Sequence, residues 1–221
     1  GKNSQNYGEL FGEEEQLTVI RGVDASKPRT PDEKAAQLLS TEIKSIVQAK
    51  QLGNPDARVM LTEPSNTPLL QAKASFHNGL QTGDYPRFGA KFWENAQISN
   101  NWSFYQSTVP KTIMFGGREG ILYWQNGDGD IANSSGSVVR GTEAWGKKGI
   151  SISAMGSLFA TSYTGTLYNE NTVSLIPKDK NDIVALWAFC SSPSYSIEVR
   201  KITQALKVRG DLIKIPFDLE H

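Results

Sequence analysis

The chain has 221 residues, of which 38% are hydrophobic and 21% are charged. This composition excludes general disorder and allows one substantial domain, alone or with a smaller appendage. Lys and Arg together number 23, as do Asp and Glu, which excludes a protein that holds nucleic acid through its overall charge. A role on DNA must rest on a local basic face or on a parent protein that supplies further contacts.

Cysteine and histidine are too few for a disulfide or for a zinc site of these residues. Cys190 is the single cysteine, and the two histidines are His77 and His221. We expect Cys190 to be a small buried side chain within the apolar run of residues 183–190. The sequence shows neither a membrane span nor a signal peptide. We therefore expect a cytoplasmic protein, present here as a segment of a longer chain.

A helix is predicted over about residues 31–51. Thr30 is suited to cap it, Pro31 occupies the first helical position, and Glu33 completes a capping box. Polar and proline-containing sequence from residue 53 onward ends it. The following side chains recur on one face: Leu39, Ile43, Ile46 and Lys50. A short strand is expected before it at residues 16–20, and we treat residues 1–75 as a strand/helix linker segment.

Glycine and aromatic residues become frequent from Phe76 onward, between short runs of β-forming residues. The predicted strands are residues 112–115, 121–124, 137–140, 149–154, 173–176 and 211–217. A helix is predicted to begin near Asp182 and to bury its apolar run against the sheet, and another is predicted over residues 195–206. The fold class is therefore α+β, with a twisted glycine-rich β-sheet and packed helices over residues 76–221.

Catalytic motifs are not found in the sequence. A methyltransferase acting on an exocyclic amine needs a glycine-rich cofactor loop and an Asn/Asp-Pro-Pro-aromatic loop, and neither occurs; nor does a P-loop. Asp128 and Asp130 lack the remaining ligands of a calcium loop and are typical of a turn. His77, beside Phe76, is more typical of a structural role than of Ser-His or Cys-His catalysis. We expect no catalytic residue, no metal and no cofactor in this chain.

Three segments carry the residue types that read DNA, which are planar polar side chains on loops or strand ends beside small residues. The first flanks Gly116-Gly117, the second follows Trp124, and the third flanks Trp145. The candidates are Lys111, Arg118, Gln125, Asn126, Arg140, Lys147 and Lys148. If Trp145 is exposed, it offers a face for stacking beside the basic pair. In the alternative, Trp124 and Trp145 are core residues.

Residues 79–88 read Gly-Leu-Gln-Thr-Gly-Asp-Tyr-Pro-Arg-Phe, and Phe92-Trp93-Glu94 follows. This resembles the start of the target-recognition domain in large adenine-specific DNA methyltransferases. These are the single-chain type IIG restriction-modification enzymes and the related methyltransferases of BREX-type phage defence. The pattern of that family has an asparagine where this sequence has Tyr85.

Further segments resemble the same family in the same order, so that the resemblance covers about residues 76–221. They are Lys111 with Phe115–Gly117, Leu122–Trp124 with Asn126–Gly127, Gly149–Ser153, residues 183–192 and Asp211–Asp218. The sequence Cys190-Ser-Ser departs from the Leu-Asn-Ser turn of the family. The last segment is also similar to the end of the recognition domains in type I specificity subunits.

The resemblance implies a sequence-specific DNA recognition module without catalytic machinery of its own. A catalytic domain of the same parent chain would bind S-adenosylmethionine and methylate an adenine at N6, at a site that this module positions in double-stranded DNA. Phosphate contacts are expected from Lys111, Arg118, Lys147 and Lys148. Base-edge contacts are expected from Arg140, Gln125 and Asn126, and Arg87 in the opening motif is a further DNA-binding candidate.

Two other functions remain open at this point. One is a carbohydrate-binding module, in which Trp93, Trp102, Trp124 and Trp145 form a stacking platform for sugars. The other is a protein-interaction domain that uses exposed aromatic side chains as anchors.

Overall fold

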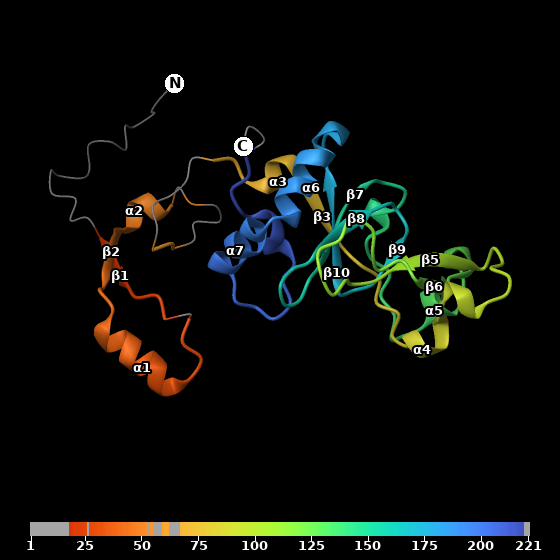
Figure 1. Cartoon of the computed structure of the whole chain (residues 1–221), viewed down its shortest axis with the longest axis horizontal. Helices are drawn as coiled ribbons and strands as arrows, with labels where there is room; N and C mark the ends of the chain where they lie inside the picture. The colour runs from red at the N-terminus through yellow and green to blue at the C-terminus, as the bar shows by residue number, and fades with distance from the viewer. Residues whose placement is uncertain (1–17, 26, 53, 55–58, 62–66, 219–221) are drawn as a thin grey trace, which may run out of the picture. The chain divides into compact units, whose positions relative to one another are not determined.

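The computed structural model describes residues 18–25, 27–52, 54, 59–61 and 67–218, which form an α+β fold (Figure 1). The chain divides into two compact units, residues 1–66 and residues 67–221. We expected the boundary after residue 75. Leu70 and Ala74 instead lie in the hydrophobic core of the larger unit, so the segment before residue 76 contributes to that unit.

The predicted start of the first helix is confirmed. Thr30 Oγ1 accepts a hydrogen bond from the Glu33 N–H at 3.3 Å, and the Glu33 carboxylate accepts one from the Thr30 N–H at 3.1 Å. With Pro31 at the first helical position, this capping box begins α1 (Pro31–Ser40). Backbone hydrogen bonds from Thr30 and Arg29 lower the pKa of Glu33 because they favour the carboxylate.

The predicted length of this helix, about residues 31–51, is wrong. α1 ends at Ser40, and β2 (Lys44–Val47) pairs antiparallel with β1 (Val19–Gly22). Ile46, within β2, is β-branched and prefers an extended backbone, and β1 supplies the backbone hydrogen bonds that a helix would have made. β1 overlaps the strand expected at residues 16–20, of which residues 16 and 17 lie outside the described residues. One short helix completes the unit, α2 (Gln48–Gln51).

A four-stranded antiparallel sheet forms the centre of the larger unit. Its strands, in spatial order, are β3 (Ala74–Asn78), β10 (Thr172–Pro177), β7 (Gly149–Ser153) and β8 (Ala160–Tyr163). Alternate residues such as Ile150, Ile152 and Leu175 are buried on one face, where the main hydrophobic core lies. The strands predicted at residues 149–154 and 173–176 are thereby confirmed.

Helices cover the apolar face of this sheet (Figure 1). They are α3 (Leu70–Lys73), α6 (Ile183–Ser191), α7 (Pro193–Ile202) and the 3₁₀ turn η7 (Gly210–Ile213). α6 and α7 confirm the two predicted helices, and Cys190 is buried as expected. The strand predicted at residues 211–217 is wrong, because this segment begins with the turn η7. Within that turn, the Leu212 carbonyl accepts a hydrogen bond from the buried Tyr195 hydroxyl at 3.2 Å. Of the described helices, none is long and apolar enough to cross a membrane.

A second four-stranded sheet lies beside the first within the larger unit. Its strands, in spatial order, are β4 (Gly89–Lys91), β6 (Gly120–Tyr123), β5 (Trp102–Gln106) and β9 (Leu167–Tyr168). The short elements of the larger unit are α4 (Tyr85–Phe88), η3 (Phe92–Glu94), η4 (Gln125–Gly127), α5 (Asp130–Asn133), η5 (Thr142–Ala144) and η6 (Lys180–Asp182). β6 confirms the strand predicted at residues 121–124.

Two further predicted strands, besides that at residues 211–217, are absent from the two sheets of the larger unit. The segment predicted at residues 112–115 runs beside β8, with backbone hydrogen bonds through Ile113 and Met114, without forming a regular strand. The segment predicted at residues 137–140 is reduced to a single bridge between Val138 and Gln81. In both cases the pairing partner lies more than 40 residues away, and the contact is too short to extend a ladder.

The two sheets are joined through polar side chains. The Gln106 side-chain amide, at the end of β5, donates to the carbonyls of Gly116 (3.2 Å) and Ser162 (3.0 Å). The Tyr168 hydroxyl, in β9, donates to the His77 carbonyl in β3 at 3.1 Å. Burial raises the pKa of Tyr168, so this hydroxyl keeps its proton as a donor. These contacts join the second sheet to both edge strands of the first, β8 and β3.

The first and last described segments of the larger unit pair with each other. Leu69 and Pro216 form an antiparallel bridge. The Leu70 N–H donates to the Ile215 carbonyl at 2.9 Å, and the Phe217 N–H donates to the Pro68 carbonyl at 2.8 Å. The chain therefore enters and leaves this unit at neighbouring positions.

Candidate nucleic-acid interface

Lys147 and Lys148 lie at the open end of the β7–β8 pair. Both are exposed and directly precede β7, whose first residue, Gly149, pairs with Tyr163. The Gly146 N–H donates to the Gly165 carbonyl at 2.9 Å, which fixes the approach to the strand. A Cβ atom on Gly149 would lie 2.2 Å from the Leu175 carbonyl oxygen, so glycine is required for β7 to approach β10. The sheet therefore places this basic pair on a defined rim.

Arg118 reaches the same end of the β7–β8 pair. Its Nη2 atom donates to the Ser162 carbonyl at 2.9 Å and to the Ser162 hydroxyl at 3.1 Å. Ser162 is next to Tyr163 in β8. Tyr163 pairs with Gly149, which directly follows Lys148. Burial lowers the pKa of Arg118 because it removes water from the guanidinium. Arg118 is thus a charge held in place by the sheet edge.

Lys111 lies toward the other end of β8. The next residue, Thr112, accepts a hydrogen bond on Oγ1 from the Ala160 N–H at 3.2 Å. Ala160 is three residues from Tyr163 along the strand, a separation of roughly 10 Å. Lys111, Arg118, Lys147 and Lys148 therefore follow one strand, and we call them the cationic edge. Among the described residues, no acidic side chain lies within ion-pair distance of its three lysines.

Arg87, Gln125 and Asn126 form a separate group around Asp130. Arg87 Nη2 lies 2.9 Å from the Asp130 carboxylate, and the Gln125 side-chain oxygen accepts from the Asp130 N–H at 3.3 Å. Gln125 and Asn126 both have positive φ, 50° and 57°, in the turn that follows β6. Asn126 is exposed at this turn, whereas Arg87 is already paired with an acid.

Trp124 and Trp145 connect this turn with the cationic edge. Their rings pack edge to face with centroids 5.6 Å apart, and Trp124 is only 8% exposed. Trp124 directly precedes Gln125, and Trp145 lies two residues before Lys147. The core alternative is therefore confirmed for Trp124, whereas Trp145 is partly buried and packs against the core. Their contact fixes the two groups of polar side chains relative to each other.

Arg140 belongs to neither group through its contacts. It is half-exposed, between the Val138–Gln81 bridge and Gly141. Gly141 has φ +77°, and a Cβ atom there would lie 2.3 Å from the Tyr168 hydroxyl. The segments before and after Arg140 are thus both fixed in position. No described residue forms an ion pair with its guanidinium.

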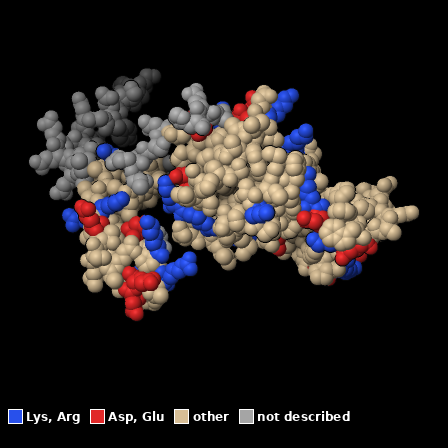
Figure 2. Space-filling view, in the orientation of Figure 1, with Lys and Arg blue, Asp and Glu red and all other residues tan. Residues whose placement is uncertain are grey.

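Charge on the larger unit is nearly balanced, with 15 Lys and Arg against 13 Asp and Glu in residues 67–221. Figure 2 shows Lys and Arg side chains at separate places on the visible face, with acidic groups near several of them. Any attraction of a polyanion must therefore come from local groups such as the cationic edge.

Ser75, His77 and Glu143 are near one another but lack the geometry of a catalytic triad. Ser75 Oγ and His77 Nε2 share a hydrogen bond of 2.9 Å, whereas His77 Nδ1 is 3.9 Å from the Glu143 carboxylate, beyond hydrogen-bond distance. The Ser75 hydroxyl also faces the Ile176 carbonyl at 3.4 Å, an acceptor that does not stabilise an oxyanion. Among the described residues, no group of three or more His, Cys, Asp and Glu side chains is placed to hold a metal ion.

The stability of the larger unit is expected to fall as the pH drops from about 7 through the lowered pKa of His77. Desolvation lowers the pKa of His77 below its ordinary 6.5, although Glu143 acts in the opposite direction. The unfolded chain therefore takes up a proton at a higher pH than the folded chain, and the stabilisation present above pH 6.5 is lost as the pH falls through the lowered pKa. Urea midpoints measured across this range should fall for the wild type. His77→Gln should show a smaller fall, and an equal fall would contradict the assignment.

A hollow of about 400 Å³ lies at the turn between α6 and α7. Hydroxyl and apolar groups line it, among them Thr112, Leu158, Ser192 and Ser196. No charged side chain lines it, and none of the predicted DNA-binding residues does.

Sequence reasoning missed the exposed apolar side chains beside the cationic edge. Ile113, Met114 and Phe115 are 42%, 50% and 64% exposed. We interpreted them as part of a strand because they are consecutive β-forming residues. Their position between Lys111 and the Gly116-Gly117 turn was the available signal for a loop.

Comparison with known proteins adds no relative: no protein-family model matches the sequence, and the search of curated proteins finds no match.

Proposed function

We propose that this chain is a DNA target-recognition module of a larger adenine-N6 DNA methyltransferase or restriction-modification enzyme. It positions double-stranded DNA for a catalytic domain of the same parent chain, and that domain binds S-adenosylmethionine. The module itself contributes recognition and no catalysis. The proposal places the parent enzyme in the bacterial cytoplasm, where it meets chromosomal and phage DNA.

The observation that carries the proposal is the cationic edge. Its four side chains come from two segments about 30 residues apart, and the pairing of β7 with β8 brings them to one strand. Three of them are exposed lysines that form no ion pair among the described residues, and of these Lys147 is near enough to Glu143 to lower the pKa of that carboxyl group. Cations on a fixed backbone can neutralise successive phosphates and release their counterions without first breaking ion pairs.

Several glycines that carry the family resemblance have a structural role and offer no side chain for contact with DNA. A Cβ atom on Gly79 would lie 1.9 Å from the Asn169 carbonyl oxygen, and one on Gly117 would lie 2.2 Å from the Ser107 carbonyl oxygen. Gly83 has φ +73° and packs on Gly136. Glycine at these positions is needed for the path of the backbone. We therefore assign the reading of the DNA sequence to other residues.

Base readout is proposed for Arg140, Gln125 and Asn126. Arg140 is without an acidic partner among the described residues, and Asn126 is exposed at a turn. Arginine pairs in bidentate fashion with guanine, and asparagine or glutamine with adenine, each worth roughly 1–3 kcal/mol of discrimination. Gln125 has its side-chain oxygen on Asp130, which leaves its NH₂ group as the donor. Arg87 is the weakest candidate because DNA would compete with its ion pair to Asp130.

Carbohydrate binding is less well supported by the same geometry. A sugar platform needs open aromatic faces, but Trp124 is buried and packs edge to face on Trp145. Trp102 packs in the same way on Tyr123, which leaves Trp93 as the well-exposed tryptophan among those proposed.

Removing the three lysines of the cationic edge is expected to weaken DNA binding and to flatten its salt dependence. Fluorescence anisotropy of the whole chain with labelled duplex DNA, at several salt concentrations, gives the slope of log K against log salt. The variant Lys111→Ala/Lys147→Ala/Lys148→Ala should reduce that slope by about 3, since each phosphate contact contributes roughly 0.9.

The matched control removes three lysines that already have acidic partners. Lys73, Lys201 and Lys207 lie 4.0, 2.5 and 3.5 Å from Asp182, Glu198 and Glu170 respectively. Their joint replacement by alanine should leave the slope nearly unchanged. Equal slopes for both triple variants, or no binding by the wild type at low salt, would contradict the proposed function.

A further inference from the structure

Ile113, Met114 and Phe115 form an exposed apolar ridge on the loop that connects β5 to β6. The ridge runs along the outer edge of β8. The Ile113 N–H donates to the Ala160 carbonyl at 3.1 Å, and the Ser162 N–H donates to the Met114 carbonyl at 2.9 Å. These bonds add the ridge to the side of the four-stranded sheet, so its backbone follows that of β8.

The far side of the ridge is also fixed. The Gly116 N–H donates to Thr161 Oγ1 at 3.0 Å, and the Ser107 N–H donates to the Gly117 carbonyl at 2.6 Å. Gly117 has φ +69°, and a Cβ atom there would meet the Ser107 carbonyl oxygen, so the turn requires glycine. The ridge is therefore ordered in the free protein, and a ligand that binds it does not have to order the loop.

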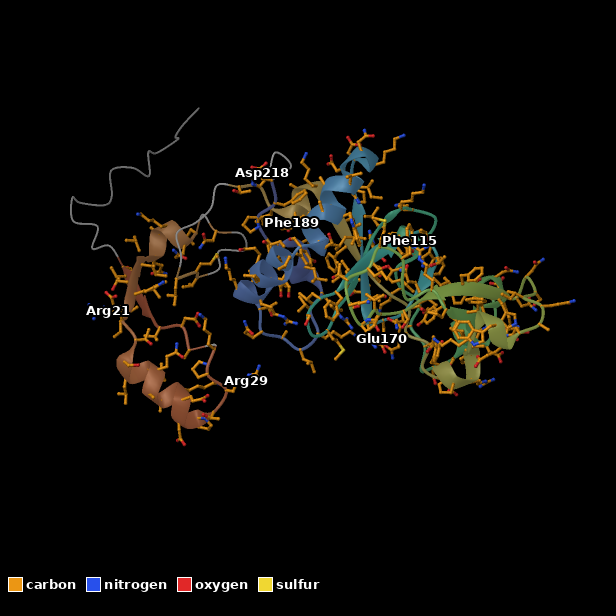
Figure 3. The ribbon with its side chains drawn as sticks, in the orientation of Figure 1. Arg21, Arg29, Phe115, Glu170, Phe189 and Asp218 are labelled. Atoms are coloured by element: carbon orange, nitrogen blue, oxygen red, sulfur yellow. The ribbon has the colours of Figure 1, made fainter. Side chains whose placement is uncertain are left out.

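The side chains of the ridge nevertheless remain in solvent. Phe115 is 64% exposed, and Figure 3 labels its position in the larger unit. The Arg118 guanidinium lies over its ring, 5.2 Å from the centroid. A single exposed apolar residue needs no explanation, but three in sequence on a fixed backbone indicate a contact surface.

Charge around the ridge determines which ligand it suits. Lys111 precedes it, Arg118 follows it, and Lys147 and Lys148 lie at the end of the β7–β8 pair that Arg118 reaches. A protein partner would have to place acidic groups opposite these cations around its own apolar patch. DNA offers both components, since phosphates meet the cations while base faces accept an apolar wedge.

We propose that Phe115, supported by Met114, packs against base faces at a partly unstacked step of duplex DNA, between phosphates held by the cationic edge. This inference rests on the proposed DNA-recognition function and adds a deformation of the duplex to it. A wedge of this kind binds better where the bases are already poorly stacked, because less stacking energy is lost on insertion.

The test uses the whole chain and two labelled duplexes of about 20 base pairs, identical except for one central mismatch. Anisotropy at low salt should show that the wild type binds the mismatched duplex at least roughly tenfold more tightly. Phe115→Ala should bind both duplexes alike, with the affinity for the paired duplex little changed, and Phe115→Tyr should keep the preference. Phe104→Ala is the matched control because Phe104, in β5, is 53% exposed and carries no part of the proposal.

The outcomes separate this inference from the function on which it rests. Absence of binding to either duplex overturns the proposed function. Binding without a mismatch preference, or with a preference that Phe115→Ala retains, overturns the wedge and leaves the function intact. A Phe115→Ala variant that keeps both DNA affinities but loses a complex with another protein assigns the ridge to a protein interface and overturns the wedge.

Discussion

Replacing Gly79 by alanine is expected to destabilise the larger unit by at least about 3 kcal/mol. The new Cβ atom would lie 1.9 Å from the Asn169 carbonyl oxygen and 2.7 Å from that of Tyr168. Both are backbone atoms, and the Tyr168 carbonyl already accepts from the Leu80 N–H at 2.8 Å. Relief of the clash must therefore separate two paired segments. For a unit of this size the midpoint of thermal unfolding should fall by roughly 6–12 °C, measured by circular dichroism.

Gly136→Ala is the control for this variant. The nearest atom to a Cβ at Gly136 is the Gly83 Cα atom at 3.6 Å, an ordinary contact distance. The midpoint of this variant should stay within a few degrees of the wild type. A Gly79→Ala protein with a normal midpoint would show that the opening glycine of the family-like motif is not structural, and would return it to the candidates for DNA contact.

Trp124→Ala is expected to cost about 3–5 kcal/mol, with a fall of roughly 6–20 °C in the unfolding midpoint. Trp124 is buried in the core of the second sheet with Leu122 and Phe88, and it packs edge to face on Trp145. Its loss leaves a cavity and also frees the turn that carries Gln125 and Asn126. Differential scanning calorimetry of the whole chain measures the loss directly.

Trp93→Ala is the matched control, since Trp93 is 59% exposed and its loss should cost about 1 kcal/mol or less. A cycle of Trp124→Ala and Trp145→Ala should give a coupling of about 0.5–1.5 kcal/mol for the edge-to-face contact. Additive losses in that cycle would show that the two rings act independently, and the link between the Gln125 turn and the cationic edge would be lost with it.

Elements with strong local signals were predictable from the sequence. The capping box of Thr30 and Glu33 identifies the start of α1, and short runs of β-forming residues between glycine-containing turns identify β7 and β10. The predictions failed where a segment pairs with a strand that is distant in the sequence. Ile43, Ile46 and Val47 have helical spacing, but the last two lie in a strand because β1, about 25 residues earlier, pairs with it. β3 was not predicted, because its five residues mix polar and apolar types without a β-type pattern. They form a strand by pairing with β10.

The residue types of the candidate site were predictable from the sequence. Which of these side chains are free of internal hydrogen bonds and ion pairs was not. The guanidinium of Arg87 is paired with Asp130, 43 residues away, and that of Arg118 with Ser162, 44 residues away. A list of basic residues treats all of them as free cations. The fold decides which are bound internally, and it leaves Lys111, Lys147 and Lys148 as the exposed members of the edge.

The pairing of Leu69 with Pro216 has a consequence for how such a unit is used. Because its first and last described segments lie side by side, a unit of this kind can be inserted into a host protein at a single junction, much as a loop is inserted. A cassette of this kind can be exchanged for another with different surface residues while the host keeps its own packing. On the proposed DNA-recognition function, new specificities would then arise by replacement of the whole unit as well as by point substitution.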